Sequence, residues 1–238
     1  MDFGIIFVFT AIIATIFGGY LAFSLRRHLK LLVAFSAGLL ISIAFFDLIP
    51  EAFGALPGQT IFVSLSLVVG FLAYFILEKF ILMHSCFEPH ECETHSHSGF
   101  SGMAGLVLHR LLDGIVLGIS LKASPETALM VGIAITIHSV PDGINSVTVL
   151  LLKKQKQLVQ WLLTVSSVLF IGFIATFFIA LPEKVLGLLL GFVAGWFIYL
   201  GASDLMPEAH KERSISLLFA TICGFAFVIA LILLLPRV

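Results

Sequence analysis

The chain has 238 residues, of which 60% are hydrophobic and only 11% are charged, and its formal net charge is −1. An ordinary soluble domain has about a quarter of its residues charged, so these charges are too few to cover a water-facing surface. This composition excludes a soluble globular enzyme and a disordered chain, and the lack of a basic excess excludes a nucleic-acid-binding protein. It predicts an all-α protein that crosses a membrane several times.

Eight apolar runs are each long enough to cross the hydrocarbon core, which takes a helix of about 20 residues. In chain order they are residues 3–25, 31–53, 60–83, 101–121, 125–152, 158–181, 184–206 and 214–235. The runs are continuous and do not alternate with a period of two, which favours helices over the strands of a barrel. The first run has no basic residue before it, so we interpret it as a retained helix and not as a cleaved signal. Residues 1–238 are therefore expected to form a single transmembrane domain.

The basic residues of the connecting loops are concentrated on one side of this predicted domain. Loops one, three, five and seven, with the span ends beside them, contain nine of them, whereas the opposite side has only Lys122, Lys184 and Arg237. The nine are Arg26, Arg27, Lys30, Lys79, Lys153, Lys154, Lys156, Lys211 and Arg213. Because basic loops stay in the cytoplasm, an even number of spans puts both termini on the extracytoplasmic side. The predicted location is the cell membrane.

Two sequence motifs occur twice, once in each half of the chain. Residues 47–52 read D-L-I-P-E-A near the end of span two, and residues 204–209 read D-L-M-P-E-A near the end of span seven. Residues 109–115 in span four and 138–144 in span five share the pattern H-x-x-x-D-G-I. Spans one to three thus correspond to spans six to eight, and span four to span five. Since three is odd and two spans intervene, the halves cross the membrane in opposite directions, as in the inverted repeats of secondary transporters.

The second motif brings four metal-ligating side chains to the interface between the two halves. His109 and Asp113 are four residues apart, as are His138 and Asp142, and this spacing puts both members of each pair on one helix face. Two imidazoles and two carboxylates that face each other suit a divalent ion such as zinc. Ionisable groups at this depth are costly, so the motifs predict a metal site or a proton pathway. Pro141 is expected to kink the helix beside His138, either to free a carbonyl group for the ion or as a structural kink alone.

The eight-span layout, the two H-x-x-x-[acid]-G motifs and a His-rich loop between spans three and four resemble the ZIP (Zrt/Irt-like) family of divalent metal transporters. The resemblance covers the whole chain, and H-S-V-P-D-G at residues 138–143 is close to the family's H-N-x-P-E-G. It implies a 3+2+3 inverted-repeat transporter that takes up zinc, iron or a related ion such as manganese towards the cytosol. The metal is then cargo, and no prosthetic group is expected. The resemblance also implies a homodimer in the lipid bilayer, in which spans one, four, five and six slide against the other four.

Three features depart from the family pattern. Both motif carboxylates are Asp where the family usually has Glu, and Leu112 replaces a proline. Arg110 takes the place of a polar Asn that helps to build a second metal site in some members of the family. Because a guanidinium is permanently charged and cannot bind a metal, we hypothesise that Arg110 replaces the second ion. The candidate partners of its charge are Asp142, Asp47 and Asp204. The same charge could instead lower the affinity for cations and prevent transport.

Two further groups of residues are candidates for binding or guiding the ion. Residues 84–100 form the predicted cytosolic loop, whose composition suggests a flexible, low-affinity metal collector or sensor, or else an ordinary polar loop. Its candidate ligands are His84, Cys86, His90, Cys92, His95 and His97. The candidates for the ion pathway are Asp47, Glu51, Asp204, Glu208, Ser139 and Asn145.

Two other functions are compatible with the same residues. A His/Asp site can hold a metal that activates water in an intramembrane zinc hydrolase, but the sequence has no H-E-x-x-H and no evident nucleophile arrangement. Arg110 and the loop also suggest a metal sensor that does not transport. The repeated motifs favour a transporter over a hydrolase, and we therefore do not expect an enzyme.

Overall fold

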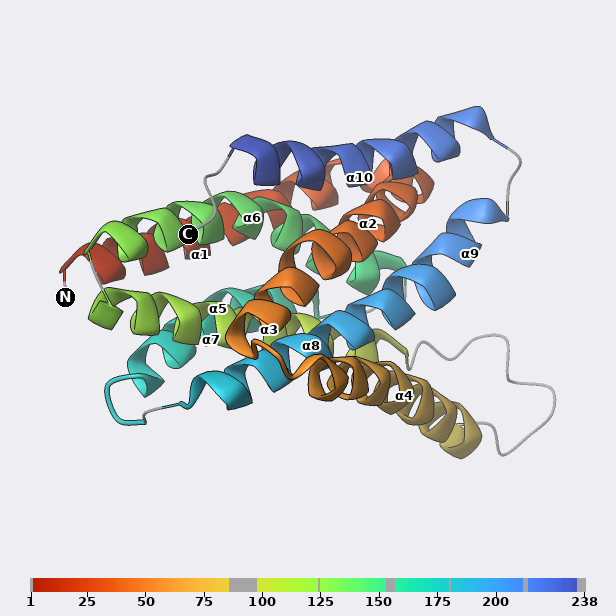
Figure 1. Ribbon diagram of the computed structural model, residues 1–238. Helices are drawn as coiled ribbons and strands as arrows, with labels where there is room; N and C mark the ends of the chain where they lie inside the picture. Colours follow the sequence, from red (N-terminus) through yellow and green to blue (C-terminus); the bar gives the residue numbers. More distant parts are fainter. Residues whose placement is uncertain are drawn as a thin grey trace.

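The structure, a computed structural model, describes residues 2–85, 98–123, 125–152, 157–179, 181–211 and 214–234. These residues contain no strand, and eight of their helical segments are long and apolar enough to cross a membrane. The helices run roughly in one direction and form a bundle (Figure 1). The prediction of an all-α, multi-pass membrane protein with eight spans is confirmed.

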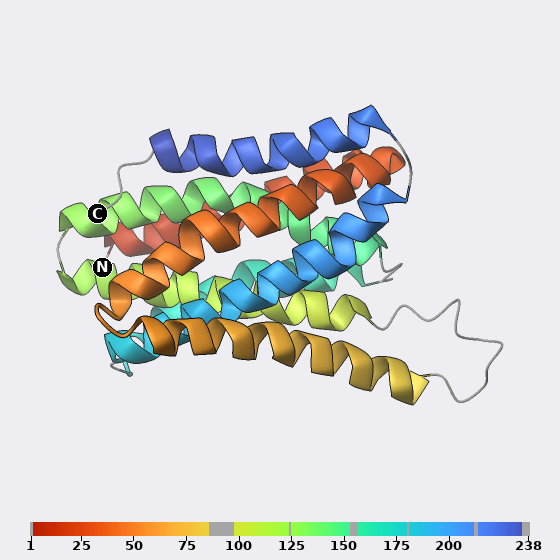
Figure 2. The ribbon, with the colours of Figure 1, turned by 45° about the vertical axis from the view of Figure 1, so that its right-hand side comes forward.

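The spans follow one another in alternating directions. The first four are α1 (Asp2–Ser24), α2 with η2 and α3 (Leu29–Ile43, Ala44–Leu48 and Ile49–Ala55), α4 (Thr60–Ser85) and α5 (Ser98–Ala123). The last four are α6 (Pro125–Leu152), α7 (Leu158–Ala175), α8 with η3 and α9 (Glu183–Tyr199, Leu200–Leu205 and Met206–His210) and α10 (Ile215–Leu234). A 3-10 turn, η1 (Arg26–His28), joins α1 to α2. Helix α1 begins and α10 ends at the same end of the bundle (Figure 2), which we call the N-terminal end, and the opposite end is the η1 end.

The predicted sixth span, 158–181, is too long, because α7 already ends at Ala175. The hydroxyl of Thr176 donates to the carbonyl of Phe173 at 2.7 Å, and the next amides bond three residues back in place of four. The ammonium of Lys122 donates to the carbonyl of Thr176, so a cation from α5 satisfies a group at the end of α7. Apolar residues continue past this point, and for that reason the hydropathy pattern concealed the helix end.

The loop predicted at residues 84–100 is shorter at both ends. Helix α4 continues to Ser85 and α5 begins at Ser98, so His84 belongs to the last turn of α4. The other proposed loop ligands, Cys86, His90, Cys92, His95 and His97, lie outside the described residues.

Four pairs of helices cross with their backbones in contact at glycines. A Cβ atom at Gly18 of α1 would collide with the carbonyl oxygen of Val140 in α6, and one at Gly143 of α6 would collide with that of Thr15 in α1. The same reciprocal arrangement pairs Gly114 of α5 with Gly172 of α7, Gly38 of α2 with Gly224 of α10, and Gly70 of α4 with Gly195 of α8. Small residues allow this close approach, which is typical of helix packing in membranes. Gly19 and Gly191 also lie close to other helices, since a Cβ at each would meet the side chains of Leu162 and Ser66 respectively.

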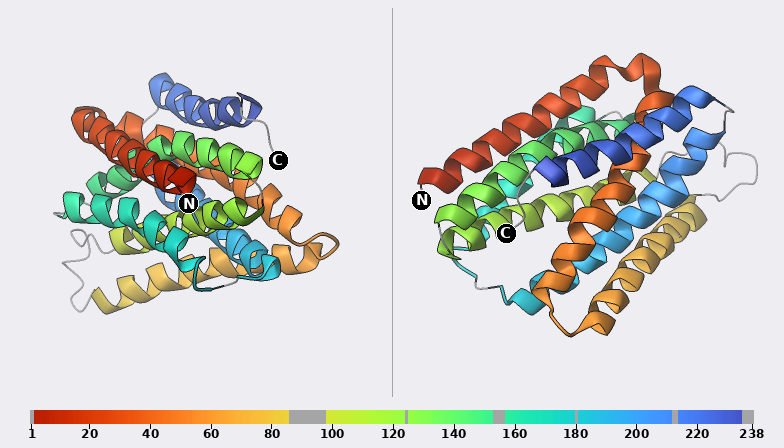
Figure 3. Two further views of the ribbon diagram at one scale, coloured as in Figure 1. Left: turned by 90° about the vertical axis from the view of Figure 1, so that its left-hand side faces the viewer. Right: turned by 45° about the horizontal axis from the view of Figure 1, so that its top comes forward.

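These crossings divide the bundle into two groups of helices. Helices α1, α5, α6 and α7 form one group, in which α1 packs on α6 and α5 packs on both α6 and α7. Helices α2, α4, α8 and α10 form the other, in which α2 packs on α10 and α4 on α8 (Figure 3). The groups meet chiefly where α2 contacts α6 and where α5 contacts α8.

The two D-L-x-P-E-A motifs share an unusual backbone geometry. Asp47 lies in the π-helical turn η2 and Asp204 in the π-helical turn η3, and each turn leads into a short helix with proline in its first turn. A proline inside a helix donates no amide hydrogen and crowds the carbonyl four residues earlier, and the wider π turn relieves that crowding. The repeated proline therefore explains why both aspartates stand on a widened turn.

Replacing Gly143 with alanine is expected to lower the free energy of unfolding by about 1–3 kcal/mol, because the added Cβ forces α1 away from α6. Thermal unfolding of the purified protein in detergent measures the change. Gly54→Ala in α3 is the matched control, since no atom lies within 4 Å of a Cβ at Gly54. Equal melting temperatures for the two variants would contradict the close crossing.

Candidate metal site

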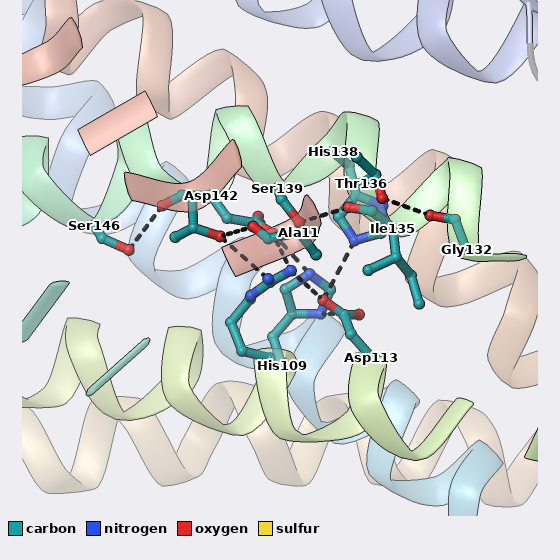
Figure 4. A network of polar contacts seen from close by, with 12 residues as sticks. Ala11, His109, Asp113, Gly132, Ile135, Thr136, His138, Ser139, Asp142 and Ser146 are labelled. Carbon is teal, nitrogen blue, oxygen red and sulfur yellow. Dashed lines mark hydrogen bonds and ion pairs between the residues drawn. The ribbon is translucent and has the colours of Figure 1, made fainter. Parts of the chain in front are cut away.

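Four metal-ligating side chains meet where α5 and α6 cross the middle of the bundle. His109 and Asp113 come from α5, and His138 and Asp142 come from α6. One ligating atom from each lies within 4.8 Å of those from the other three. In Figure 4 the two helices present these side chains towards each other. The i, i+4 spacing in the sequence thus identified a cluster that the fold does assemble.

The distances within the cluster are close to those that a bound zinc ion would impose. The Nε2 atom of His138 is 3.3 Å from an Asp113 carboxylate oxygen, and His109 lies 3.6 Å from Asp113 and 3.9 Å from Asp142. Zinc binds nitrogen and oxygen at about 2.0–2.2 Å, so tetrahedral ligand atoms stand about 3.4 Å apart. Both ring nitrogens of His109 and the Oδ1 atom of Asp142 have no hydrogen-bond partner in the part of the chain that the structure describes. A small contraction of the cluster would therefore satisfy these atoms with a metal.

A cavity of about 620 Å³ connects the N-terminal end of the bundle with this cluster. Asp47, Glu51 and Glu183 contribute carboxylates to its lining, and His138 and Pro141 form part of its inner wall. The side chain of His138 is 20% exposed, whereas that of His109 is 1% exposed and that of Asp142 is fully buried. His138 is thus the first of the four ligands that an ion entering this cavity would meet. Glu183 was not a predicted pathway residue, because it stands just outside an apolar run.

The opposite side of the cluster is closed by apolar side chains. Met103, Leu106, Val149, Phe197 and Leu200 are buried in one hydrophobic core on the side of the η1 end. The ring of Phe197 packs edge-on against that of His109, with 5.3 Å between their centroids. The structure is therefore open to the cluster from the N-terminal end and closed from the η1 end.

Arg110 is fully buried and joins the two carboxylates of the cluster. Its Nη1 atom donates to Asp113 at 2.9 Å and to Asp142 at 3.2 Å, and its Nη2 atom donates to the hydroxyl of Thr15 in α1 at 3.1 Å. Asp142 was one of its three predicted partners. Asp113 and Thr15 were not predicted, although the i, i+3 spacing of Arg110 and Asp113 was visible in the sequence.

The remaining pathway candidates lie in different surroundings. Asp204 accepts a hydrogen bond from the hydroxyl of Tyr74 at 3.0 Å. Glu208 forms an exposed ion pair with Lys211 at 2.5 Å. The hydroxyl of Ser139 donates at 2.6 Å to the carbonyl one turn earlier in its own helix, so Ser139 does not point a free hydroxyl at the cluster.

Among the described residues, three other buried polar side chains have no hydrogen-bond partner. They are Asn145 and Thr148 in α6 and Ser36 in α2, and all three are fully buried. Leaving such a group unpaired costs about 1–3 kcal/mol. Asn145 was a predicted pathway residue, whereas a lone Ser or Thr in an apolar run gave no signal for the other two.

Comparison with known proteins finds similarity to zinc transporters. A family model described as ZIP Zinc transporter matches residues 1–104 and 90–232. The zinc transporter YKE4 of Saccharomyces cerevisiae is 29% identical over 141 residues, which is 52% of this chain and 40% of that protein. The zinc transporter ZIP13 of Pongo abelii is 25% identical over 202 residues, which is 78% of this chain and 60% of that protein. The zinc transporter ZIP9-B of Xenopus laevis is 28% identical over 170 residues, which is 63% and 56% respectively. The matches thus span between 40% and 60% of the length of these three relatives.

Replacing Arg110 with leucine is expected to lower the free energy of unfolding by about 3–5 kcal/mol, because two buried carboxylates lose their cation. Thermal unfolding with a chelator present measures this loss, since a divalent ion could otherwise replace the guanidinium. Arg26→Leu is the matched control, because Arg26 is exposed and contacts only the ring and carbonyl of Phe23 among the contacts described. If both variants unfold alike, Arg110 does not stabilise the pair.

Proposed function

Because the chain belongs to the ZIP zinc transporter family, we propose that it carries divalent metal ions, with zinc as the expected cargo, across the membrane towards the cytosol. The observation that carries the proposal is the cluster of His109, Asp113, His138 and Asp142 below an open acidic cavity. Mixed nitrogen and oxygen ligands suit zinc, and iron and manganese are compatible with them.

The charges along the cavity support entry from the N-terminal end. Carboxylates at Asp47, Glu51 and Glu183 attract cations into a confined space with low-dielectric walls. The ion then exchanges water for the imidazole of His138 and for the three deeper ligands. Because fixed ligands replace the hydration shell, the free-energy cost of holding an ion at mid-membrane depth is lowered.

The position of Arg110 supports a site for a single ion. A second divalent ion that bridges Asp113 and Asp142 would stand against a permanent cation 2.9 and 3.2 Å from the two carboxylates. The guanidinium supplies part of the positive charge that such an ion would bring. It is permanently charged and, as a side chain of α5, it stays at the site.

Basic residues support the orientation of the protein. Arg26, Arg27 and Lys30 at the junction of α1 and α2, together with Lys211 after α9, lie at the η1 end. The positive-inside rule makes that end cytoplasmic and puts both ends of the chain on the extracytoplasmic side. The membrane we propose is the cell membrane. The segment between α4 and α5 then lies in the cytosol, where its histidines and cysteines would collect or sense metal.

The glycine crossings support an inverted repeat of three, two and three spans. Gly114 and Gly143 hold the same position in the two H-x-x-x-D-G-I motifs, and Gly38 and Gly195 stand equally far before the aspartate of each D-L-x-P-E-A motif. The inverted repeat relates the α1/α6 crossing to the α7/α5 crossing, and the α2/α10 crossing to the α8/α4 crossing. Transport by a homodimer would shift the α1, α5, α6 and α7 group against the α2, α4, α8 and α10 group.

Membership of a family of transporters agrees with the expectation that the chain is not an enzyme, and it argues against a hydrolase. A metal sensor that does not transport is separated from the proposal by a measurement of flux.

His138→Ala is expected to lower zinc uptake into proteoliposomes by at least about tenfold, since loss of even an outer-shell partner costs about 10–100-fold in metal affinity. His28→Ala is the matched control, because His28 is exposed in η1 at the η1 end. Wild-type uptake by His138→Ala, or no uptake by the wild-type protein, would contradict transport through this cluster.

Elemental analysis after dialysis is expected to find one more tightly bound zinc ion per chain in the wild-type protein than in His138→Ala. Zinc bound by the segment between α4 and α5 would remain in that variant, which separates the two sources. Loss of two ions per chain on the same substitution would overturn the single-ion site.

A further inference from the structure

We propose that Asn145, Thr148 and Ser36 form the inner half of the ion path, an exit lined by neutral oxygen atoms along the contact between α2 and α6. A divalent ion that keeps part of its water shell would pass them after leaving the His/Asp cluster. This inference rests on the proposed function and names the step after the ion is bound.

The three residues lie on the inner side of the cluster. Asn145 falls on the helix face of His138 and Asp142, seven and three residues further along α6, and Thr148 is almost one turn beyond it. Helix α2 begins and α6 ends at the η1 end, so Ser36 and Asn145 each lie about two turns from that end.

Helices α2 and α6 are in contact at this depth. Leu32 and Phe35 of α2 pack with Ile144 and Val147 of α6 in one hydrophobic cluster. Ser36 follows Phe35 directly. The three polar residues therefore flank a boundary between the two groups of helices.

Burial without partners indicates that these polar atoms serve another conformation. Both the oxygen and the nitrogen of the Asn145 amide lack a hydrogen bond to any described residue, as do the hydroxyls of Thr148 and Ser36. Leucine, valine and alanine have similar shapes and would fill a permanently dry core without this cost. Opening of the inner half would give these groups water or the ion as partners.

The chemistry of the three side chains suits release. Amide and hydroxyl oxygens are ligands for divalent ions, but they carry no net charge and so attract an ion less than the carboxylates of the central cluster do. The other contact between the two groups, α5 with α8, presents Met103, Leu106, Phe197 and Leu200 at this depth. These four side chains have no oxygen atoms, whereas Ser36 and Thr148 bring unpaired hydroxyls to the two helices that meet at the other contact.

Asn145→Leu tests the proposal because a residue of the ion path and a residue that only fills the core predict different rates of zinc uptake for this variant. Initial zinc uptake into proteoliposomes is expected to fall about tenfold or more, the loss expected when a charged species forgoes one polar contact. The melting temperature is expected to stay equal or rise, and zinc bound per chain after dialysis is expected to remain that of the wild type. If Asn145 has no role in transport, the variant is expected to unfold at the same temperature and to take up zinc at the wild-type rate. That result would overturn the proposal.

Two variants serve as controls. Ser166→Ala removes a buried hydroxyl of α7 that donates to the carbonyl of Leu162 at 2.7 Å, outside the proposed path, and it is expected to leave uptake unchanged. Asn145→Ser restores a neutral oxygen and is expected to transport faster than Asn145→Leu. Equal uptake by the serine and leucine variants would count against a role for the oxygen.

If Asn145→Leu does not fold, the double variant Ser36→Ala with Thr148→Val makes the same test with smaller changes, and wild-type uptake by it would overturn the proposal. Failure of the proposed function has a different signature. In that case the wild-type protein itself neither takes up zinc nor binds it at the central cluster.

Discussion

A permanent positive charge lies at the centre of this membrane domain, enclosed by protein on all sides. The guanidinium of Arg110 is stable there because Asp113 and Asp142 both accept hydrogen bonds from it and Thr15 accepts a third. Breaking such a buried pair is far more costly than forming it is favourable, so each partner must be held in place. The packing of α1, α5 and α6 follows from this requirement.

The H-x-x-x-D-G-I motif meets that requirement with adjacent residues. Asp142 supplies a carboxylate to Arg110, and Gly143 beside it lets α1 approach so closely that a Cβ would strike the carbonyl of Thr15. The close approach brings the Thr15 hydroxyl to the guanidinium. One dipeptide thus supplies a charge for the site and allows the backbone contact that completes it.

Local patterns in the sequence predicted the parts of the structure that depend on local physics. Apolar runs set by membrane thickness gave the eight helices, and i, i+4 spacing gave the four clustered ligands, because both properties are determined within one helix. The predicted end of α7 was wrong because the helix end depends on another helix. The ammonium of Lys122, from α5, donates to the carbonyl of Thr176. Thr15, Ser36 and Thr148 could not be recognised for a similar reason, since each is defined by what a different helix places beside it. The π turns at Asp47 and Asp204 lay within reach of sequence reasoning, because both motifs place a proline three residues after the aspartate.

The reciprocal glycines also have a mechanical consequence. At each of the four crossings a backbone carbonyl of one helix occupies the space where a side chain of the other would stand. If one helix slid by one residue along its partner or rotated about its own axis, a Cβ would collide with that carbonyl. The register of each helix pair is therefore fixed. The eight spans therefore behave as four stiff two-helix units, and we expect shear between these units rather than within them. The units can therefore move relative to one another while the helix crossing inside each unit keeps its geometry.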